Sequence, residues 1–106
     1  MSTNVYATGI ELILEERERQ LSKLGWSQDH DAQYINDELL QAAMVYMALG
    51  TTEAETGQLS VADLKDIWPW PEYAIKITNK LDSLTKAGAL IAAEIDRIIY
   101  ASRQLN

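Results

Sequence analysis

Apolar residues recur at helical spacing in three stretches of the chain. The first stretch runs from about Gly9 to Leu24, and its large aliphatic residues fall near one face: Ile10, Ile13, Leu14, Leu21 and Leu24. Recurrence at intervals of three and four residues predicts an amphipathic helix that buries this face. Gly25 is suited to end the helix, and Trp26 just beyond it is suited to pack back on the last turn.

The second stretch predicts a helix that begins after Asn36 and runs through Leu39 to Leu49, with Gly50 as its end. Asn36 is a favourable N-cap, and Asp37 and Glu38 place negative charge in the first turn, where it complements the helix dipole. Residues 27–35 are polar and lack helical periodicity, so they are expected to form a loop.

The third stretch predicts a long helix from about Ile77 to Arg103, with a core seam at helical spacing made of Ile77, Leu81, Leu84, Gly88, Ile91, Ile95 and Ile98. From Ala87 to Ala93 the helix is small and apolar nearly all round, which predicts burial on every side as the central post of a bundle. Lys86 and Glu94 flank this segment, and charges beside a core need a partner or a ligand.

A long connection covers residues 51–71 and is rich in Thr, Glu and Gly, with a short helix expected around residues 63–66. It ends in Trp68-Pro69-Trp70-Pro71, where the two prolines enforce an extended backbone. A connection of this length in a small domain is usually functional or partly mobile.

No stretch alternates apolar and polar residues as a strand would, so the expected fold is all-α. We expect one domain over residues 1–106, built as a helical bundle of three main helices plus a short helix. Three helices with so apolar a centre leave apolar surface uncovered. A homodimer or higher homo-oligomer that completes a larger bundle is therefore expected.

Composition narrows the classes of function. The chain has no Cys and a single His, which excludes disulfides, thiol nucleophiles and multi-His metal sites. Its net charge of -7 argues against binding to a nucleic-acid duplex and suits either carboxylates that hold a divalent cation or an ordinary acidic domain. No apolar run approaches the length of a membrane span and no signal peptide is recognisable, so a soluble cytoplasmic protein is expected, with no membrane partner.

Two polar groups in the first third of the chain are candidates for binding. Arg17 and Gln20 lie toward the apolar side of the first helix, where the Arg fork suits a phosphate; the alternative is a solvated charged face, with Glu15 and Arg19 paired four residues apart. His30, between two Asp residues, suits a metal or acid–base role, or is a capping or surface residue.

Three further groups lie later in the chain. Asp37 and Glu38 offer hard oxygen ligands for Mg²⁺, or serve only to stabilise the start of a helix. Lys86 and Glu94 line one side of the last helix, with Asp82 placed one turn before Lys86 to form an intrahelical ion pair. Trp70 either gives a surface on which a nucleobase stacks or, with its neighbouring residues, forms a hydrophobic latch over the bundle.

Taken in order, several short segments resemble a small MazG-like family common in phages and prophages. They are Glu16-Arg-Glu-Arg-Gln20, Gly25-Trp26 followed by His30-Asp31, Glu38-Leu39 with Ala42-Ala43 and Tyr46, Trp68-Pro69-Trp70, and Lys86-Ala-Gly-Ala-Leu-Ile-Ala-Ala-Glu-Ile95 with Arg97. The wider superfamily comprises all-α nucleoside triphosphate pyrophosphohydrolases, which release a nucleoside monophosphate and pyrophosphate.

The resemblance implies a helical bundle, a homo-oligomer, Mg²⁺ as cofactor and a nucleotide (NTP or dNTP) as ligand. It implies Glu38 as the catalytic residue and main metal ligand, with further metal ligands drawn from Asp37, Asp82 and Glu94. The residues implied to hold the nucleotide are Arg17, Gln20, His30, Lys86 and Trp70.

The chain departs from the superfamily's acidic pattern at two places. The pattern has Glu-Glu-x-x-Glu on one helix and Glu-x-x-Asp on the next, whereas this chain has Asp37-Glu38-Leu39-Leu40-Gln41 and Ser83-Leu84-Thr85-Lys86. A protonated lysine pairs with a phosphate or carboxylate instead of ligating Mg²⁺. The alternative expectation is therefore a non-catalytic helical module that binds a nucleotide or a protein partner.

Overall fold

The computed structural model describes residues 7–104 as helices joined by loops, with no strand in that range. In chain order the elements are α1 (Gly9–Ser22), α2 (Gln28–Asp31), α3 (Glu38–Leu49), α4 (Thr52–Glu55), α5 (Val61–Leu64), the 3-10 helix η1 (Glu72–Ala74) and α6 (Lys80–Gln104). The expected all-α class and the three main helices are confirmed. Within the same range, no helix has both the length and the apolar character needed to cross a bilayer.

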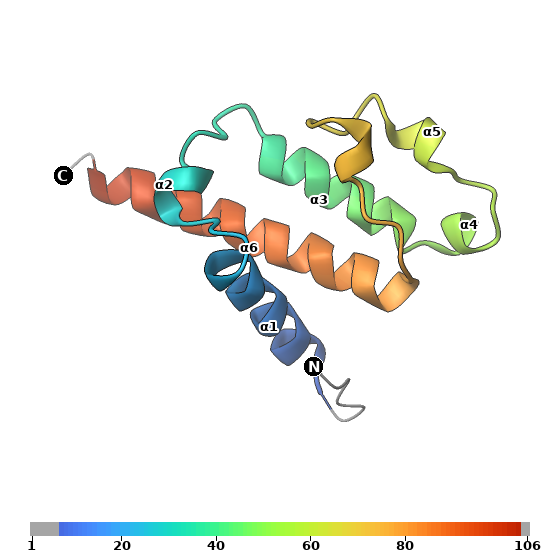
Figure 1. Cartoon of the computed structure of the whole chain (residues 1–106), viewed down its shortest axis with the longest axis horizontal. Coiled ribbons are helices and arrows are strands. Elements are labelled where there is room, and N and C mark those ends of the chain that lie inside the picture. Colours follow the sequence, from blue (N-terminus) through green and yellow to red (C-terminus); the bar gives the residue numbers. More distant parts are fainter. Residues whose placement is uncertain (1–6, 105–106) are drawn as a thin grey trace.

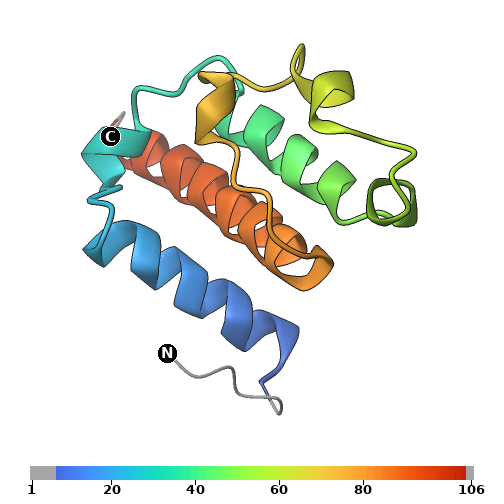
Figure 2. The same cartoon turned by 45° about the vertical axis from the view of Figure 1, so that its right-hand side comes forward.

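The long helix α6 is the centre of the fold. It lies between α1 and α3, as Figure 2 shows, and α2 packs against it as well. The connection after α3 carries α4 and α5 and returns through η1 to the start of α6, on the α3 side of the molecule (Figure 1). This arrangement places the Trp-Pro-Trp segment over the groove between α3 and α6.

The hydrophobic core forms mainly between α3 and α6. Two alanines of α3 and two of α6 belong to it, and such small side chains let the two helix backbones approach closely. Its buried members are Leu39, Ala42, Ala43, Val45, Tyr46, Leu64, Trp68, Ile75, Ala87, Leu90 and Ala93. Burial of the segment from Ala87 to Ala93 is therefore confirmed on most sides, but Ile91 is 44% exposed, so the expectation of burial all round is wrong on one face.

The expected core seam of the last helix is wrong. Its aliphatic members are exposed in the protomer: Ile77, Leu81, Leu84, Ile91, Ile95 and Ile98. The face that α6 turns toward α3 carries Ser83, Ala87, Leu90 and Glu94 instead. The physical reason is that the close approach of α3 requires small residues, so the bulky aliphatic stripe is turned outward.

The expected buried face of α1 is also wrong. Ile10 is 81% exposed and Leu14 is 55% exposed, whereas the buried residues of this helix are Arg17 and Gln20. Leu21 and Leu24 are exposed as well. Contact between α1 and α6 depends on Ile13, whose Cδ1 lies only 2.5 Å from where a Cβ would stand on Gly88. A glycine at this position lets the two helices cross closely.

Helix boundaries follow local hydrogen bonding. Thr8 and Glu11 form a reciprocal capping box at the start of α1, which ends at Ser22, two residues before the expected end. Within the expected loop at 27–35 the chain forms the short helix α2, so that expectation is wrong there. Gly50 ends α3 as expected.

The start of α3 differs from the sequence prediction. Its N-cap is Asp37, not Asn36, and Asp37 has a left-handed φ of 66° without a capping hydrogen bond from its side chain. Glu38 compensates, because its Oε1 accepts the backbone N–H of Asn36 at 2.7 Å. The Glu38 carboxylate is thus used locally at the helix start.

Candidate binding site

A cavity of about 710 Å³ opens between α1, α3, α6 and the segment from Trp68 to Thr78. Its volume is in the range of cavities that bind small molecules and cofactors. The aromatic lining residues are Trp26, Tyr34, Tyr46, Trp68, Trp70 and Tyr73. The polar and charged lining residues are Glu16, Arg19, Gln20, His30, Lys76, Thr78 and Lys86.

One wall of the cavity is a continuous run of rings, here called the aromatic wall: Trp26, His30, Tyr34 and Trp70. Trp26 and His30 are stacked nearly parallel with centroids 5.9 Å apart, and Tyr34 stands edge-on to His30 at 5.4 Å. Trp70 stands edge-on to Tyr34 at 5.3 Å. Such contacts fix the ring planes, so the wall is preformed for another flat ring.

Trp68 extends this run into the core. It packs edge-on to both Trp70 and Tyr46, and its Nε1 donates to the carbonyl oxygen of Pro71 at 2.9 Å. The Tyr46 hydroxyl accepts the backbone N–H of Lys76 at 2.9 Å, and burial raises the pKa of this hydroxyl. Trp68 therefore has the expected latch role, while Trp70 remains half-buried at the cavity.

A second wall, here called the ionic wall, consists of Glu16, Arg19 and Lys86, with Asp82 paired to Lys86 behind it. Arg19 donates from Nε and a terminal nitrogen to Glu16, at 2.8 and 2.7 Å, and this bidentate pair raises the pKa of Arg19. The expected pairing of Arg19 with Glu15 is thus replaced by one with Glu16. Asp82 adds to the same shift, which places it close to Arg19.

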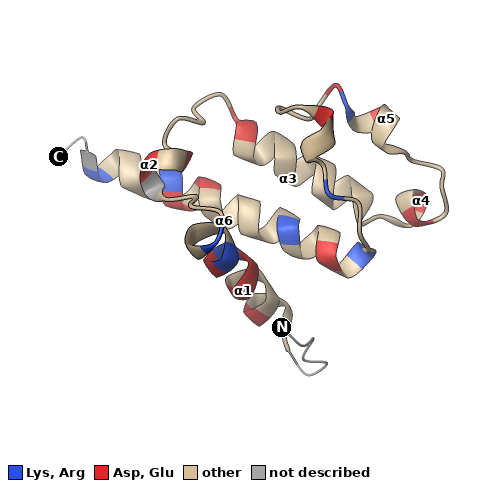
Figure 3. Cartoon of the chain, in the orientation of Figure 1, with Lys and Arg blue, Asp and Glu red and all other residues tan. Residues whose placement is uncertain are grey.

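Lys86 and Thr78 both donate to Oδ2 of Asp82. Burial opposes ionisation of Asp82 most strongly, but these hydrogen bonds outweigh it, so the pKa of Asp82 lies below its usual value. Three cations, Arg19, Lys76 and Lys86, thus line the cavity beside the single carboxylate of Glu16. Elsewhere on α1 and α6, basic and acidic segments are interspersed (Figure 3).

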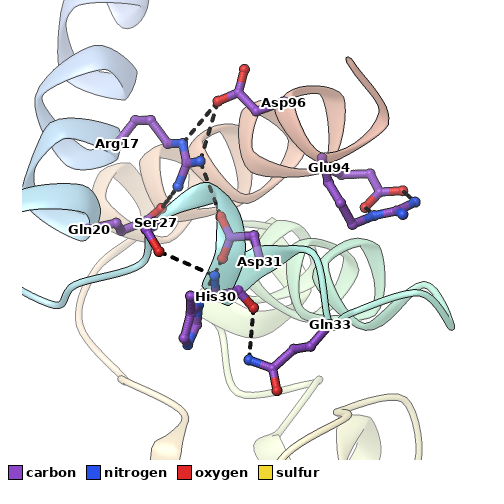
Figure 4. Close-up of polar contacts among 9 residues, drawn as sticks. Arg17, Gln20, Ser27, His30, Asp31, Gln33, Glu94 and Asp96 are labelled. Carbon is purple, nitrogen blue, oxygen red and sulfur yellow. Dashed lines mark hydrogen bonds and ion pairs between the residues drawn. The ribbon is translucent and has the colours of Figure 1, made fainter. Parts of the chain in front are cut away.

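Arg17 lies behind the cavity as the centre of a buried polar cluster, which Figure 4 shows. It donates to Asp31 at 3.1 Å, to Asp96 at 3.3 Å and to Gln20 at 3.4 Å. Oδ1 of Asp31 also lies 3.0 Å from Nδ1 of His30, within hydrogen-bonding distance. These bonds join α1, α2 and α6, so the guanidinium of Arg17 is committed to holding the fold together.

Two expected metal ligands, Asp37 and Glu38, do not line the cavity. A third, Glu94, accepts two hydrogen bonds from Arg97 at 2.8 Å, and this pair raises the pKa of Arg97, with the charges of Asp37 and Glu38 raising it further. In Figure 4 the Glu94 side chain points away from the Arg17 cluster. The Glu94 carboxylate is therefore committed to a guanidinium.

Two of the expected magnesium ligands are each paired with a cation. Asp82 is paired with Lys86, and Glu94 with Arg97. Over residues 7–104 no three side chains of the His, Cys, Asp and Glu types are grouped to hold a metal ion. The expected ligands thus lie in two separate places, each neutralised by a cation.

Four of the five residues expected to hold a ligand line the one cavity: Gln20, His30, Trp70 and Lys86. The sequence interpretation missed Arg19, Tyr34 and Lys76. Arg19 had a signal in the sequence, since it lies three residues from Glu16, the spacing of a helical ion pair. Tyr34 and Lys76 lie in non-helical segments, where spacing carries no information about which way a side chain faces.

Comparison with known proteins gives no relative for this fold and cavity: no protein-family model, no curated protein and no solved structure matches the chain.

Proposed function

We propose that this protein binds a nucleotide in the cavity between α1, α3 and α6. The observation that carries the proposal is the convergence of an aromatic wall and an ionic wall in a single cavity. Aromatic rings stack on nucleobases of any sequence, and cations recognise phosphates. Few other abundant metabolites combine a flat ring and negative charge at this size.

In the proposed complex, the base packs against the aromatic wall and is flanked by Trp70 and Tyr34. The phosphates extend toward Arg19, Lys76 and Lys86. Glu16 and Asp82 offset part of this positive charge, and the phosphates of the ligand supply further negative charge. The resemblance of the sequence to MazG-like proteins supports the same ligand class.

The geometry favours a protein that binds the nucleotide without hydrolysing it. The superfamily chemistry uses Mg²⁺ held by clustered acids, whereas the acids of this protomer are paired with Lys86 and Arg97. Magnesium-dependent pyrophosphohydrolysis remains the second candidate, supported by the ordered sequence segments alone. An assay for released pyrophosphate distinguishes the nucleotide-binding protein from the hydrolase.

The experiment is calorimetric titration of the protein with each NTP and dNTP, with and without Mg²⁺, followed by an assay for pyrophosphate at high protein concentration. We expect saturable binding that does not require Mg²⁺, and intact triphosphate afterwards. Release of pyrophosphate supports the hydrolase instead. Absence of heat and of any shift in melting temperature with every nucleotide refutes the proposed function.

We also propose that the protein is a homodimer through the exposed faces of α1 and α6. The exposed aliphatic residues Leu81, Leu84, Ile91, Ile95 and Ile98 have the spacing of a seam that packs against another helix, and Gly88 within this stripe faces Ile13 of α1. Beside it, α1 exposes Ile10 and Leu14. A two-fold axis would place identical stripes against each other and form a four-helix core.

A further inference from the structure

His30 is the member of the aromatic wall whose ring is held by a carboxylate. Nδ1 of the imidazole is 3.0 Å from Oδ1 of Asp31, and the ring plane is fixed between Trp26 and Tyr34. Its side chain keeps 32% exposure and lines the cavity. The imidazole is therefore fixed in orientation while part of it faces the ligand space.

Asp31 determines which ring nitrogen carries the proton. Its side chain is only 2% exposed, and Oδ2 forms an ion pair with the guanidinium of Arg17 at 3.1 Å. A carboxylate in such a pair accepts hydrogen bonds and donates none, so the proton of neutral His30 lies on Nδ1. The lone pair then lies on Nε2, and among the side chains that the structure describes, which do not include that of Gln28, none donates a hydrogen bond to it.

We propose that Nε2 of His30 is a hydrogen-bond acceptor that selects ligands whose aromatic ring carries an exocyclic amino group. This inference rests on the proposed function, because it concerns the base of the bound nucleotide. Adenine and cytosine present such an amino group at the ring edge, in the plane of the base. A base that lies against Trp70 and Tyr34 can direct this edge toward the neighbouring imidazole.

Pairs of nucleotides that differ only in the amino group test this selection. Affinities of AMP and purine riboside 5′-monophosphate are measured by calorimetry, as are those of CMP and its analogue without the 4-amino group. Both members of a pair carry the same phosphate. The effect of phosphate ionisation on affinity therefore cancels when the affinities of the two members are compared. We expect the amino-bearing member to bind about tenfold more tightly at pH 7.5.

The matched variant is His30→Phe, which keeps a ring between Trp26 and Tyr34 and leaves Asp31 paired with Arg17. We expect it to lose the selection at pH 7.5 while it retains most of the affinity for the analogue that lacks the amino group. Equal affinities within both pairs in the unaltered protein overturn the inference, and binding of either member leaves the proposed function standing.

The tautomer is tested separately by the ¹⁵N chemical shifts of the one imidazole, without any ligand. We expect the neutral ring to carry its proton on Nδ1, and a predominant Nε2–H form overturns the inference by itself. If no nucleotide binds, the inference fails together with the proposed function. If nucleotides bind but the amino group makes no difference to their affinity, only the inference about His30 fails.

Discussion

Lys86 is held by Asp82, which lies one helical turn earlier on α6 and accepts a hydrogen bond from its Nζ. The same carboxylate oxygen accepts from Thr78, at the end of the segment that closes the cavity. Lys86 is therefore a fixed cation at a cavity wall. Its aliphatic stem is largely buried, with the whole side chain only 15% exposed.

Lys86→Ala should weaken binding of a nucleoside triphosphate about tenfold, because it removes one desolvated charge contact to phosphate. Binding of the corresponding nucleoside, which has no phosphate, should change much less. Titration calorimetry with ATP and adenosine measures both. Lys65→Ala is the control, since Lys65 is exposed and does not line the cavity; equal losses in the two variants would contradict the assigned position of the phosphates.

Asp82 should make stability depend on pH at the acid end. Because its pKa is lower in the folded protein, its contribution to the free energy of unfolding is complete above the usual Asp pKa and is lost as the pH falls through the lowered value. The side chain is partly exposed, so the contribution is less than about 1 kcal/mol. Urea denaturation of the unaltered protein and of Asp82→Asn should converge between about pH 5 and pH 2; a constant difference would refute this account.

The two tryptophans of the Trp-Pro-Trp segment should respond differently to the same substitution. Trp68→Leu leaves a cavity in the core and should cost about 2 kcal/mol or more of stability. Trp70→Leu keeps an apolar contact with the core but loses the stacking surface, so it should cost about 1–3 kcal/mol of nucleotide binding with a smaller loss of stability. Thermal melts and calorimetry separate the effects, and a reversed order would show that Trp70 is structural.

Arg97 should decide the response to Mg²⁺. In the unaltered protein Arg97 is paired with Glu94, so Mg²⁺ alone should not raise the melting temperature. Arg97→Ala leaves the buried Glu94 carboxylate without its partner, so the variant should be less stable and should regain part of that stability with millimolar Mg²⁺. Saturable stabilisation of the unaltered protein by Mg²⁺ would show that the acids bind metal with Arg97 present.

Ile95→Asp should convert the proposed dimer to monomers, because it places a charge in the middle of the α6 stripe, where Ile95 is 52% exposed in the protomer. Sedimentation equilibrium gives the mass directly. Ile67→Asp on the far connection is the matched control and should leave the mass unchanged. A monomeric unaltered protein at micromolar concentration would refute the dimer.

Periodicity in the sequence predicted the helices well because spacing at three and four residues depends only on local geometry. It located α1, α3 and α6 to within about three residues at each end. It failed on which face points inward. Ile91 and Ile95 share an apolar face of α6, and both are exposed in the single chain. Their spacing would be the same if another part of the chain or a second chain packed against them, so it does not predict which one does.

The cavity was partly predictable for a related reason. Lys86 and Gln20 stand on helices at positions beside apolar residues, so their convergence could be anticipated. The role of Arg17 could not, because a phosphate and the buried Asp31 carboxylate present the same oxygen pair to a guanidinium. Only the path of the chain through α2 brings Asp31 to Arg17.

The cluster around Arg17 also sets the rotation of α1 about its own axis. Its bonds to Asp31 and Asp96 are satisfied at one angular setting, and turning the helix to hide its aliphatic side would pull the guanidinium out of the cluster. The cost of stranding Asp31 without its partner exceeds the gain from covering Leu14. The polar contacts of Arg17 thus keep the aliphatic side of α1 exposed to solvent. The tendency of this surface to associate with other apolar surfaces is therefore a consequence of the fold.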